Sequence, residues 1–169
     1  MEYVASNDKV YLRMMDKEDT PLIIKWRNAP HVVENFIYRK PLTEADHLSW
    51  IANKVEKGQV VQFVLGITET HEEIGSIYFR DIDRENECCE FGIFIGEKDA
   101  LGKGYGFLGQ KLSLEYAVNK MHMKTINLRV LSKNASAVHV YEKCGFKPIE
   151  GMNEITADGE KVIFMRYEV

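Results

Sequence analysis

The sequence lacks most features of secreted, membrane-bound or nucleic-acid-binding proteins. It has only three cysteines, Cys88, Cys89 and Cys144, and their odd number and spacing fit neither a disulfide framework nor a C-x-x-C metal site. No apolar run approaches the ~18–20 residues of a membrane helix, and the N-terminus has no basic segment followed by an apolar core, as a signal peptide would. We therefore expect a reduced, cytoplasmic chain without membrane association.

The chain also lacks an excess of positive charge. It carries 22 Lys and Arg against 26 Asp and Glu, a net charge of −4, so a basic nucleic-acid-binding face is not expected. The five histidines show no H-x-x-x-H or comparable pairing, and we expect no metal. No repeat, linker or low-complexity stretch divides the 169 residues, which are enough to bury a core, so a single domain over 1–169 is predicted.

The hydrophobic pattern predicts helices and strands in a mixed order. Polar turns separate three consecutive strands, as in an antiparallel meander, and a turn signal at 157–160 predicts a terminal hairpin. The segments are a strand at 9–15, short helices at 22–28, 31–37 and 44–57, strands at 60–67, 73–82 and 87–95, a helix ending near 121, a strand at 125–131, and a helix at 134–143. This order predicts a mixed α+β domain and not a doubly wound parallel sheet.

A glycine-rich stretch, DALGKGYGFLGQKLSLEYA at 99–117, precedes the long helix. Its G-x-G-x-x-G letters, completed by Gly109, match a dinucleotide fingerprint, but the strand that follows ends in LSKN without the ribose-binding carboxylate. Glycines 102, 104 and 106 nevertheless free backbone N–H groups at a helix start, and Lys103 adds a cation. The pattern favours a pyrophosphate cradle over a merely flexible connection.

Two blocks of sequence then carry a family resemblance. The segments EFGIFI, LGKGYG and LRVLSKNASAVHVYEKCGF resemble the GNAT N-acetyltransferase superfamily. Gly104 and Gly106 match the two small positions of its [QR]-x-x-G-x-[GA] loop, whereas Leu101 stands where the family usually has Gln or Arg. The second block, V-x-x-x-N-x-x-A-x-x-x-Y-E-K-x-G-F, is matched at Val130, Asn134, Ala137, Tyr141, Glu142, Lys143, Gly145 and Phe146.

The resemblance implies a fold and a co-substrate. The fold is one GNAT-like domain with a mixed, mostly antiparallel twisted sheet of about six or seven strands, splayed between the fourth and fifth and flanked by helices on both faces. Acetyl-CoA would place its pantetheine arm in the splay. The implied coenzyme-binding residues are Phe94 and Ile95 through their backbone, Gly102, Lys103, Gly104, Tyr105 and Gly106 at the pyrophosphate, and Asn134 and Lys143. Family habit also makes a homodimer through the C-terminal hairpin an expectation.

The implied chemistry is direct transfer of the acetyl group to a primary amine. A protonated amine has a pKa near ~10, so a base or a water relay must remove its proton. Glu90 is the candidate base, and the alternative is that it pairs with Arg80 or Arg84. Tyr141 is the candidate acid for the departing thiolate, and the alternative is that it only packs on the sheet.

The first helices and the final hairpin shape the acceptor site in this superfamily. Trp26, Arg27, Tyr38 and His47, within a W-R-N…H-L-x-W-I arrangement, would give a nucleotide sugar a stacking face and a cation. The alternative is that Trp26 is a core anchor, and nearby acidic residues would suit a polyamine. Amino sugars, nucleotide sugars and polyamines stay open as acceptors. So do ribosomal-protein or peptide N-termini and a non-catalytic acyl-CoA-binding module.

Overall fold

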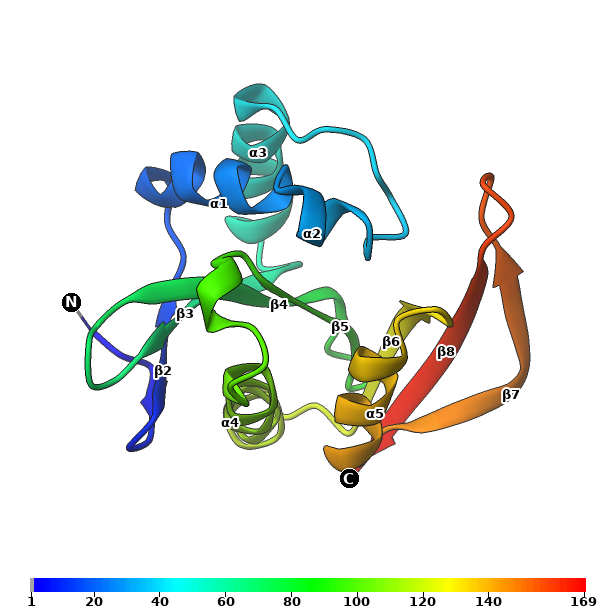
Figure 1. Ribbon diagram of the computed structural model, residues 1–169. Helices are drawn as coiled ribbons and strands as arrows, with labels where there is room; N and C mark the ends of the chain where they lie inside the picture. The colour runs from blue at the N-terminus through cyan, green and yellow to red at the C-terminus, as the bar shows by residue number, and fades with distance from the viewer. Residues whose placement is uncertain (1) are drawn as a thin grey trace.

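One twisted sheet runs through the computed structural model, which describes residues 2–169 (Figure 1). Its eight strands lie in the order β1-β2-β3-β4-β5-β6-β8-β7. The strands are β1 (Ala5–Ser6), β2 (Val10–Met14), β3 (Val61–Ile67), β4 (Glu73–Asp83), β5 (Cys88–Ile95), β6 (Thr125–Leu131), β7 (Lys147–Ile155) and β8 (Lys161–Glu168). The count exceeds the predicted six or seven because the two-residue β1 was too short to give a sequence signal.

The sheet opens between β5 and β6, the fourth and fifth predicted strands. Every other neighbouring pair is antiparallel, but these two are parallel and pair at only three positions, from Cys88↔Thr125 to Glu90↔Asn127. Beyond Glu90 the two strands have no paired residues. The predicted splay and the predicted α+β class are confirmed, and the opening leaves one edge of β5 free of strand partners.

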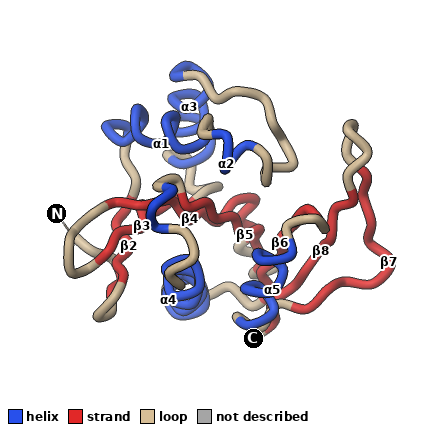
Figure 2. Tube along the Cα trace, in the orientation of Figure 1, coloured by secondary structure: helices blue, strands red, loops and turns tan. Residues whose placement is uncertain are grey.

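Helices cover both faces of the sheet (Figures 1 and 2). On one face lie α1 (Thr20–Arg27), α2 (Pro30–Val33) and α3 (Glu44–Trp50), and α3 continues into a π-helical turn at Ile51–Val55. The other face carries α4 (Tyr105–Asn119) and α5 (Ala135–Lys143). Two single 3-10 turns, Lys17–Asp19 and Lys98–Ala100, precede α1 and α4. The second predicted helix, 31–37, is shorter than expected, since the segment after Val33 leaves the helix and forms a loop.

Local capping explains where several helices begin and end. Thr43 and Asp46 form a capping box at α3, as the sequence indicates, and Gly145 ends α5 with a φ of 105°. Asp19 stands at the N-cap position of α1, but its side chain makes no capping hydrogen bond. Its carboxylate instead accepts two bonds from Arg13, at 2.9 and 2.6 Å.

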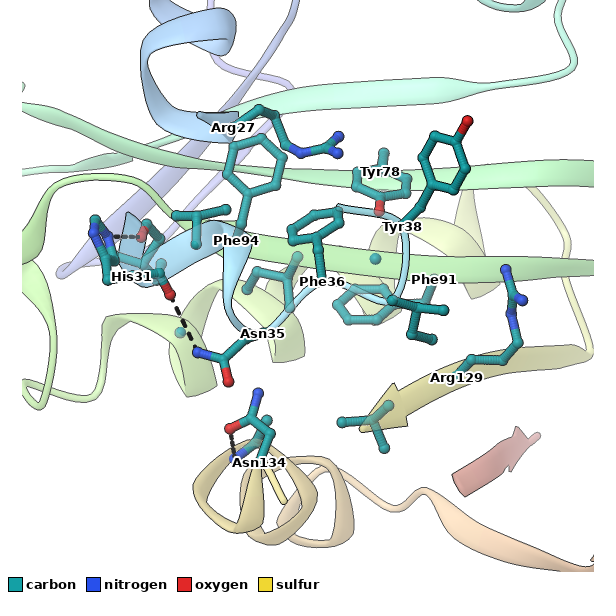
Figure 3. Close-up of a pocket in the computed structure, with 18 of the residues that line it drawn as sticks. Arg27, His31, Asn35, Phe36, Tyr38, Tyr78, Phe91, Phe94, Arg129 and Asn134 are labelled. Carbon is teal, nitrogen blue, oxygen red and sulfur yellow. Dashed lines mark hydrogen bonds between the residues drawn. The ribbon is translucent and has the colours of Figure 1, made fainter. Parts of the chain in front are cut away.

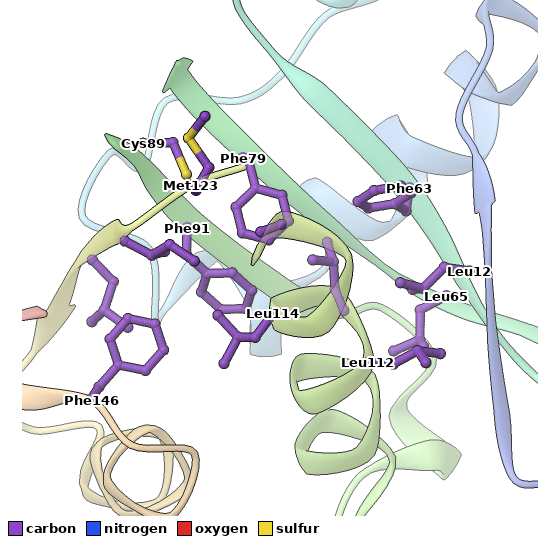
Figure 4. Close-up of a cluster of buried hydrophobic side chains, with 14 of the residues drawn as sticks. Leu12, Phe63, Leu65, Phe79, Cys89, Phe91, Leu112, Leu114, Met123 and Phe146 are labelled. Carbon is purple, nitrogen blue, oxygen red and sulfur yellow. The ribbon is translucent and has the colours of Figure 1, made fainter. Parts of the chain in front are cut away.

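Two hydrophobic clusters fix the layers. The larger lies between the sheet and helices α4 and α5, and Figure 4 shows Phe63, Phe79 and Phe91 of the sheet facing Leu112 and Leu114 of α4. The smaller joins α1–α3 to the opposite face through fully buried Trp26 and through Ile23 and Phe94, among others. The two clusters hold the sheet between two helical layers. Within residues 2–169, no helix has the length and apolar character to span a membrane.

Candidate active site

A cavity of about 1130 Å³ collects residues from both helical layers and from the opening between β5 and β6 (Figure 3). Its wall includes residues of α1, the loop after α2, β4, β5, the glycine loop, β6 and α5. Twelve sequence-predicted site residues line it: Arg27, Tyr38, His47, Glu90, Phe94, Ile95, Gly102, Gly104, Tyr105, Gly106, Asn134 and Tyr141. Trp26, Lys103 and Lys143 do not.

The glycine loop has the geometry of an anion cradle. Gly102 and Gly104 have φ values of 74° and 83°, a left-handed conformation that side chains rarely adopt. A Cβ added at Gly102, Gly104 or Gly106 would meet nothing within 4 Å, so the space beside the loop is open. Gly104 precedes α4 without any side-chain cap, which leaves the first N–H groups of the helix available. These groups and the open cavity fit a pyrophosphate.

The backbone of β5 faces the cavity at alternate residues. The N–H of Gly96 donates to the Ile74 carbonyl at 2.8 Å, so the ladder turns the backbone groups of Phe94 toward β4 and those of Ile93 and Ile95 toward the opening. The expectation that Phe94 would offer backbone groups to a pantetheine arm is therefore corrected, because β4 already engages them. The Ile95 carbonyl contacts the His31 ring, with 3.0 Å between the oxygen and Nε2.

Tyr141 projects from α5 into the cavity wall. Its ring packs edge-on against Phe91, with 6.2 Å between centroids, and against Phe146, at 5.9 Å. Burial raises the pKa of the Tyr141 phenol, with a smaller contribution from Tyr78. The hydroxyl therefore keeps its proton at neutral pH and can donate it.

Glu90 lies between two guanidinium groups. Its Oε2 accepts from Arg80 Nε at 3.0 Å and its Oε1 accepts from Arg129 Nε at 2.9 Å. The alternative of pairing with Arg80 is observed, whereas Arg84 donates to the Gly58 carbonyl instead, at 2.9 Å. Sequence reasoning missed Arg129 because its position beside Glu90 depends on the parallel register of β5 and β6. These contacts favour an ion-pairing role for Glu90.

The side of the cavity formed by α1, α3 and the loop after α2 contains the residues that the sequence predicts for the acceptor. The Arg27 guanidinium carbon lies 3.9 Å from the centroid of the Phe36 ring, and Tyr38 is 71% exposed on the loop. His47 is buried, with 2.8 Å between its Nδ1 and Thr20 Oγ1, and its Nε2 is buried without a partner in residues 2–169. Burial lowers the pKa of His47, so its ring is neutral at neutral pH.

Trp26 has a different place from the one expected of a stacking residue. It is fully buried against Phe94, its Nε1 donates to Glu97 at 2.9 Å, and a Cβ on Gly96 would collide with its ring. The structure therefore supports the alternative interpretation, in which Trp26 anchors α1 to the sheet.

The two lysines lie at the rim. Lys103 and Lys143 are exposed, and Lys143 Nζ lies 4.5 Å from the centroid of Phe107, whose ring lines the cavity. Both ammonium groups are within solvent, which weakens any contact they make with a phosphate. No group of three or more potential metal-ligating side chains occurs in residues 2–169.

Three further cavity residues were not found from the sequence. Tyr78 of β4 fills the space beside Gly92, where any side chain on β5 would collide with it. Phe36 supports Arg27, and Gln110 of α4 is fully buried with both amide atoms unpartnered within the described chain. Of these three residues, only Tyr78 had a signal in the sequence, because the alternation of β4 places it on the same face as Arg80.

Comparison with known proteins adds a family match. The model of the acetyltransferase (GNAT) domain matches residues 9–147. An uncharacterized protein from Methanocaldococcus jannaschii is 27% identical over 147 residues, 85% of this chain, and the chain spans 29% of that protein's length. The spermidine N(1)-acetyltransferase of Vibrio cholerae is 26% identical over 141 residues, which cover 83% of this chain and 80% of that enzyme.

Solved structures show that the fold is shared. Spermidine N-acetyltransferase from Vibrio cholerae in complex with CoA and spermine superposes with a TM-score of 0.86 at 22% identity, covering 96% of each chain. A dodecameric structure of the enzyme in an intermediate state has a TM-score of 0.79 at 22% identity, covering 96% of this chain and 95% of that one.

Proposed function

Because the chain belongs to the GNAT acetyltransferase family, we propose that it transfers the acetyl group of acetyl-CoA directly to a primary amine of a small molecule. The observation that carries this proposal is that the glycine loop, the free edge of β5 and Tyr141 all line one cavity. Each of these features alone has a structural explanation, but together they supply an anion cradle, a polar strand edge and a proton donor.

The coenzyme is assigned to the splayed half of the cavity. Backbone N–H groups at Gly104–Gly106 and the positive end of α4 would hold the pyrophosphate. Ile93 would offer its N–H and carbonyl to the pantetheine arm, and Ile95 its N–H, since the Ile95 carbonyl already contacts His31. Asn134 begins α5 and its amide lies on the cavity wall, where it can contact the same arm. Acetyl-CoA, when bound, supplies the activated thioester. The protein's own task is to hold it against the acceptor amine.

Two proton movements complete the proposed transfer. The amine must lose a proton before it attacks, and a water relay suits this step because both oxygens of the candidate base Glu90 already accept from arginines. Tyr141 donates its proton to the departing sulfur, and its raised pKa keeps the phenol protonated until that step. The phenol regains a proton from solvent after the thiol leaves.

The acceptor class has support of two kinds. The related Vibrio enzyme named for spermidine makes a polyamine a candidate, and the aromatic and cationic lining at Phe36, Tyr38 and Arg27 suits an amino sugar or nucleotide sugar. Ribosomal-protein and peptide N-termini remain the alternative acceptors. We also propose that the protein is cytoplasmic and that it forms a homodimer or a larger homo-oligomer. The dodecameric structure of the related Vibrio enzyme supports self-association.

A thiol-release screen tests the proposal. The purified chain is given acetyl-CoA and amino sugars, amino-sugar nucleotides, polyamines or peptide N-termini, and each acetylated product is identified by mass. Release that depends on an amine supports the transferase. Tight acetyl-CoA binding in calorimetry without release on any amine would instead identify a non-catalytic acyl-CoA-binding module.

A further inference from the structure

Arg27 stands apart from the other arginines of the chain. The remaining six each donate to an oxygen of another residue, with bonds from Arg13 to Asp19, Arg39 to Glu160, Arg80 to Glu90, Arg84 to Gly58, Arg129 to Glu90 and Arg166 to Asn127. Within residues 2–169, no hydrogen bond or salt bridge engages the guanidinium of Arg27, and its Nε is buried without a partner.

The position of Arg27 makes this lack of a counter-ion costly. Burial lowers its pKa, and the nearby charge of Arg80 adds to that effect while Tyr78 opposes it. A charge removed from water is unfavourable unless an opposite charge compensates it. Stacking on Phe36 at 3.9 Å holds the guanidinium in place but provides no acceptor for its N–H donors, and the Nε–H is shielded from water as well.

The guanidinium faces the acceptor side of the cavity. Figure 3 shows Arg27 extending toward Tyr78 and Tyr38, across the cavity from Asn134. Resident carboxylates do not compensate it: Glu90 lies between Arg80 and Arg129, and Glu154 lies 3.8 Å from Arg129.

The other two carboxylates on the cavity wall are Asp46, which caps α3 through Thr43, and exposed Glu34. A polyamine would bring further positive charge to a wall that already has an uncompensated cation. An anionic group would supply the missing partner, and a planar guanidinium matches a carboxylate or phosphate.

Resting on the proposed function, we propose that Arg27 is an anion-binding residue of the acceptor site and that the acceptor amine carries a carboxylate or a phosphate. The anion sits against the unsatisfied N–H donors of Arg27 beside Phe36, and the amine extends toward the β5–β6 opening. The acceptor class is thereby narrowed to anionic amines, such as amino-sugar phosphates, amino-sugar nucleotides or amino acids, and away from polyamines.

Matched acceptors test this proposal at saturating acetyl-CoA. Glucosamine 6-phosphate is compared with glucosamine, β-alanine with β-alaninamide, and spermidine is included as the polyamine. We expect the anionic member of at least one pair to have a kcat/KM about 10-fold or more above its neutral partner, and the pair that responds identifies phosphate or carboxylate. Spermidine as the best acceptor, with no preference in either pair, would overturn the proposal and leave the acetyltransferase activity standing.

Variants of Arg27 assign any preference to this residue. Arg27→Gln should raise KM for the anionic acceptor about 10-fold or more, so that its preference over the neutral partner is lost, and should keep or raise the thermal midpoint, since a half-buried uncompensated charge is removed. Arg27→Lys should restore part of the preference. Arg84 lies outside the cavity, so Arg84→Gln is the control and should leave the KM values of both acceptors unchanged. A preference that survives Arg27→Gln would overturn the assignment.

A binding readout separates this proposal from the failure of catalysis. With the glycine loop saturated by coenzyme A, glucosamine 6-phosphate and β-alanine are titrated while the thermal midpoint is followed. If either compound raises the thermal midpoint of the wild type but not that of Arg27→Gln, the result supports the anion site even if no amine is acetylated. Equal responses of the two proteins, or no response in either, would contradict it.

Discussion

The two ends of the cavity are built from different parts of the chain. At the coenzyme end, the protein offers mainly backbone: left-handed Gly102 and Gly104, the uncapped start of α4, and the unpaired edge of β5. At the acceptor end it offers side chains from separate elements, with Arg27 from α1, Tyr78 from β4 and Phe36 from a loop. A site made of backbone groups tolerates most side-chain substitutions except at the glycines that the loop requires. A site made of side chains changes its chemistry with each substitution.

The largest effect is expected at the coenzyme end. Gly104→Val should weaken acetyl-CoA binding about 100-fold or more, because a β-branched side chain at a φ of 83° distorts the loop and occupies the open space beside it. Isothermal titration calorimetry measures the affinity.

Gly159 supplies the matched control for backbone strain. It has the same φ of 83° with open space around it, but it lies in the β7–β8 turn and not in the cavity wall. Gly159→Val should lower the thermal midpoint through a similar strain and leave acetyl-CoA affinity unchanged. Equal loss of affinity in both variants would show that strain, and not the cradle, is being measured.

The next effect is expected where the two ends meet. Tyr141→Phe should lower kcat about 100-fold with little change in the KM for acetyl-CoA, since the thiolate loses its proton donor. Tyr167→Phe, which lies outside the cavity, is the control. A Tyr141→Phe enzyme at full rate would remove this residue from the acid role.

The pH dependence follows from the same phenol. Because burial raises the pKa of Tyr141 in the fold above the unfolded value near ~10, the neutral phenol contributes to stability below that pH and the contribution is lost as pH rises through the folded pKa. In kcat–pH profiles of the wild type, loss of the acid should therefore appear only above about pH 10. A limb below pH 9 that disappears in Tyr141→Phe would contradict the raised pKa.

A smaller kinetic effect is expected at Glu90. Glu90→Gln should destabilise the protein by about 1–3 kcal/mol, because Arg80 and Arg129 lose a charged acceptor. It should lower kcat by less than about 10-fold if a water relay removes the amine proton. Thermal denaturation and kcat of the folded enzyme are compared with those of Glu85→Gln, an exposed turn residue. A kcat loss above 1,000-fold with an unchanged midpoint would restore Glu90 as the base.

The smallest effect is expected at the rim. Lys143→Met should weaken acetyl-CoA binding by less than about 3-fold at physiological salt, because its exposed ammonium is screened by solvent. Lys147→Met, exposed on β7, is the control. Titration at low and high salt measures both affinities, and a loss above 10-fold would make Lys143 a principal coenzyme contact.

Sequence reasoning was strongest where a local pattern determines structure. The alternating strands and the turn residues predicted the α+β class, and the glycine loop with the second motif block identified the family. The resemblance to that family in turn implied the enzyme class and the splayed strands. It also placed Gly104, Gly106 and Tyr141 in a common site before any geometry was known, and the structure puts all three on the cavity wall.

It was weakest where the outcome depends on register or on tertiary packing. Arg129 reaches Glu90 only because β5 and β6 pair in parallel over three residues, which no local window encodes. Phe94 was assigned backbone contacts that the β4 register turns away from the cavity. The sequence alone does not distinguish Trp26 as a substrate-stacking residue from Trp26 as a core anchor. Its complete burial beside Gly96, which depends on tertiary packing, identifies it as the anchor.

The central claim is that coenzyme A binds between the glycine loop and the free edge of β5. Amide hydrogen exchange of the wild-type protein, followed by mass spectrometry with and without coenzyme A, tests it directly. Exchange should slow in the segments covering 91–95 and 102–107, where backbone N–H groups would meet the ligand, and stay unchanged in the β7–β8 hairpin at 151–160. Bound coenzyme A with unchanged exchange in both 91–95 and 102–107 would contradict the account.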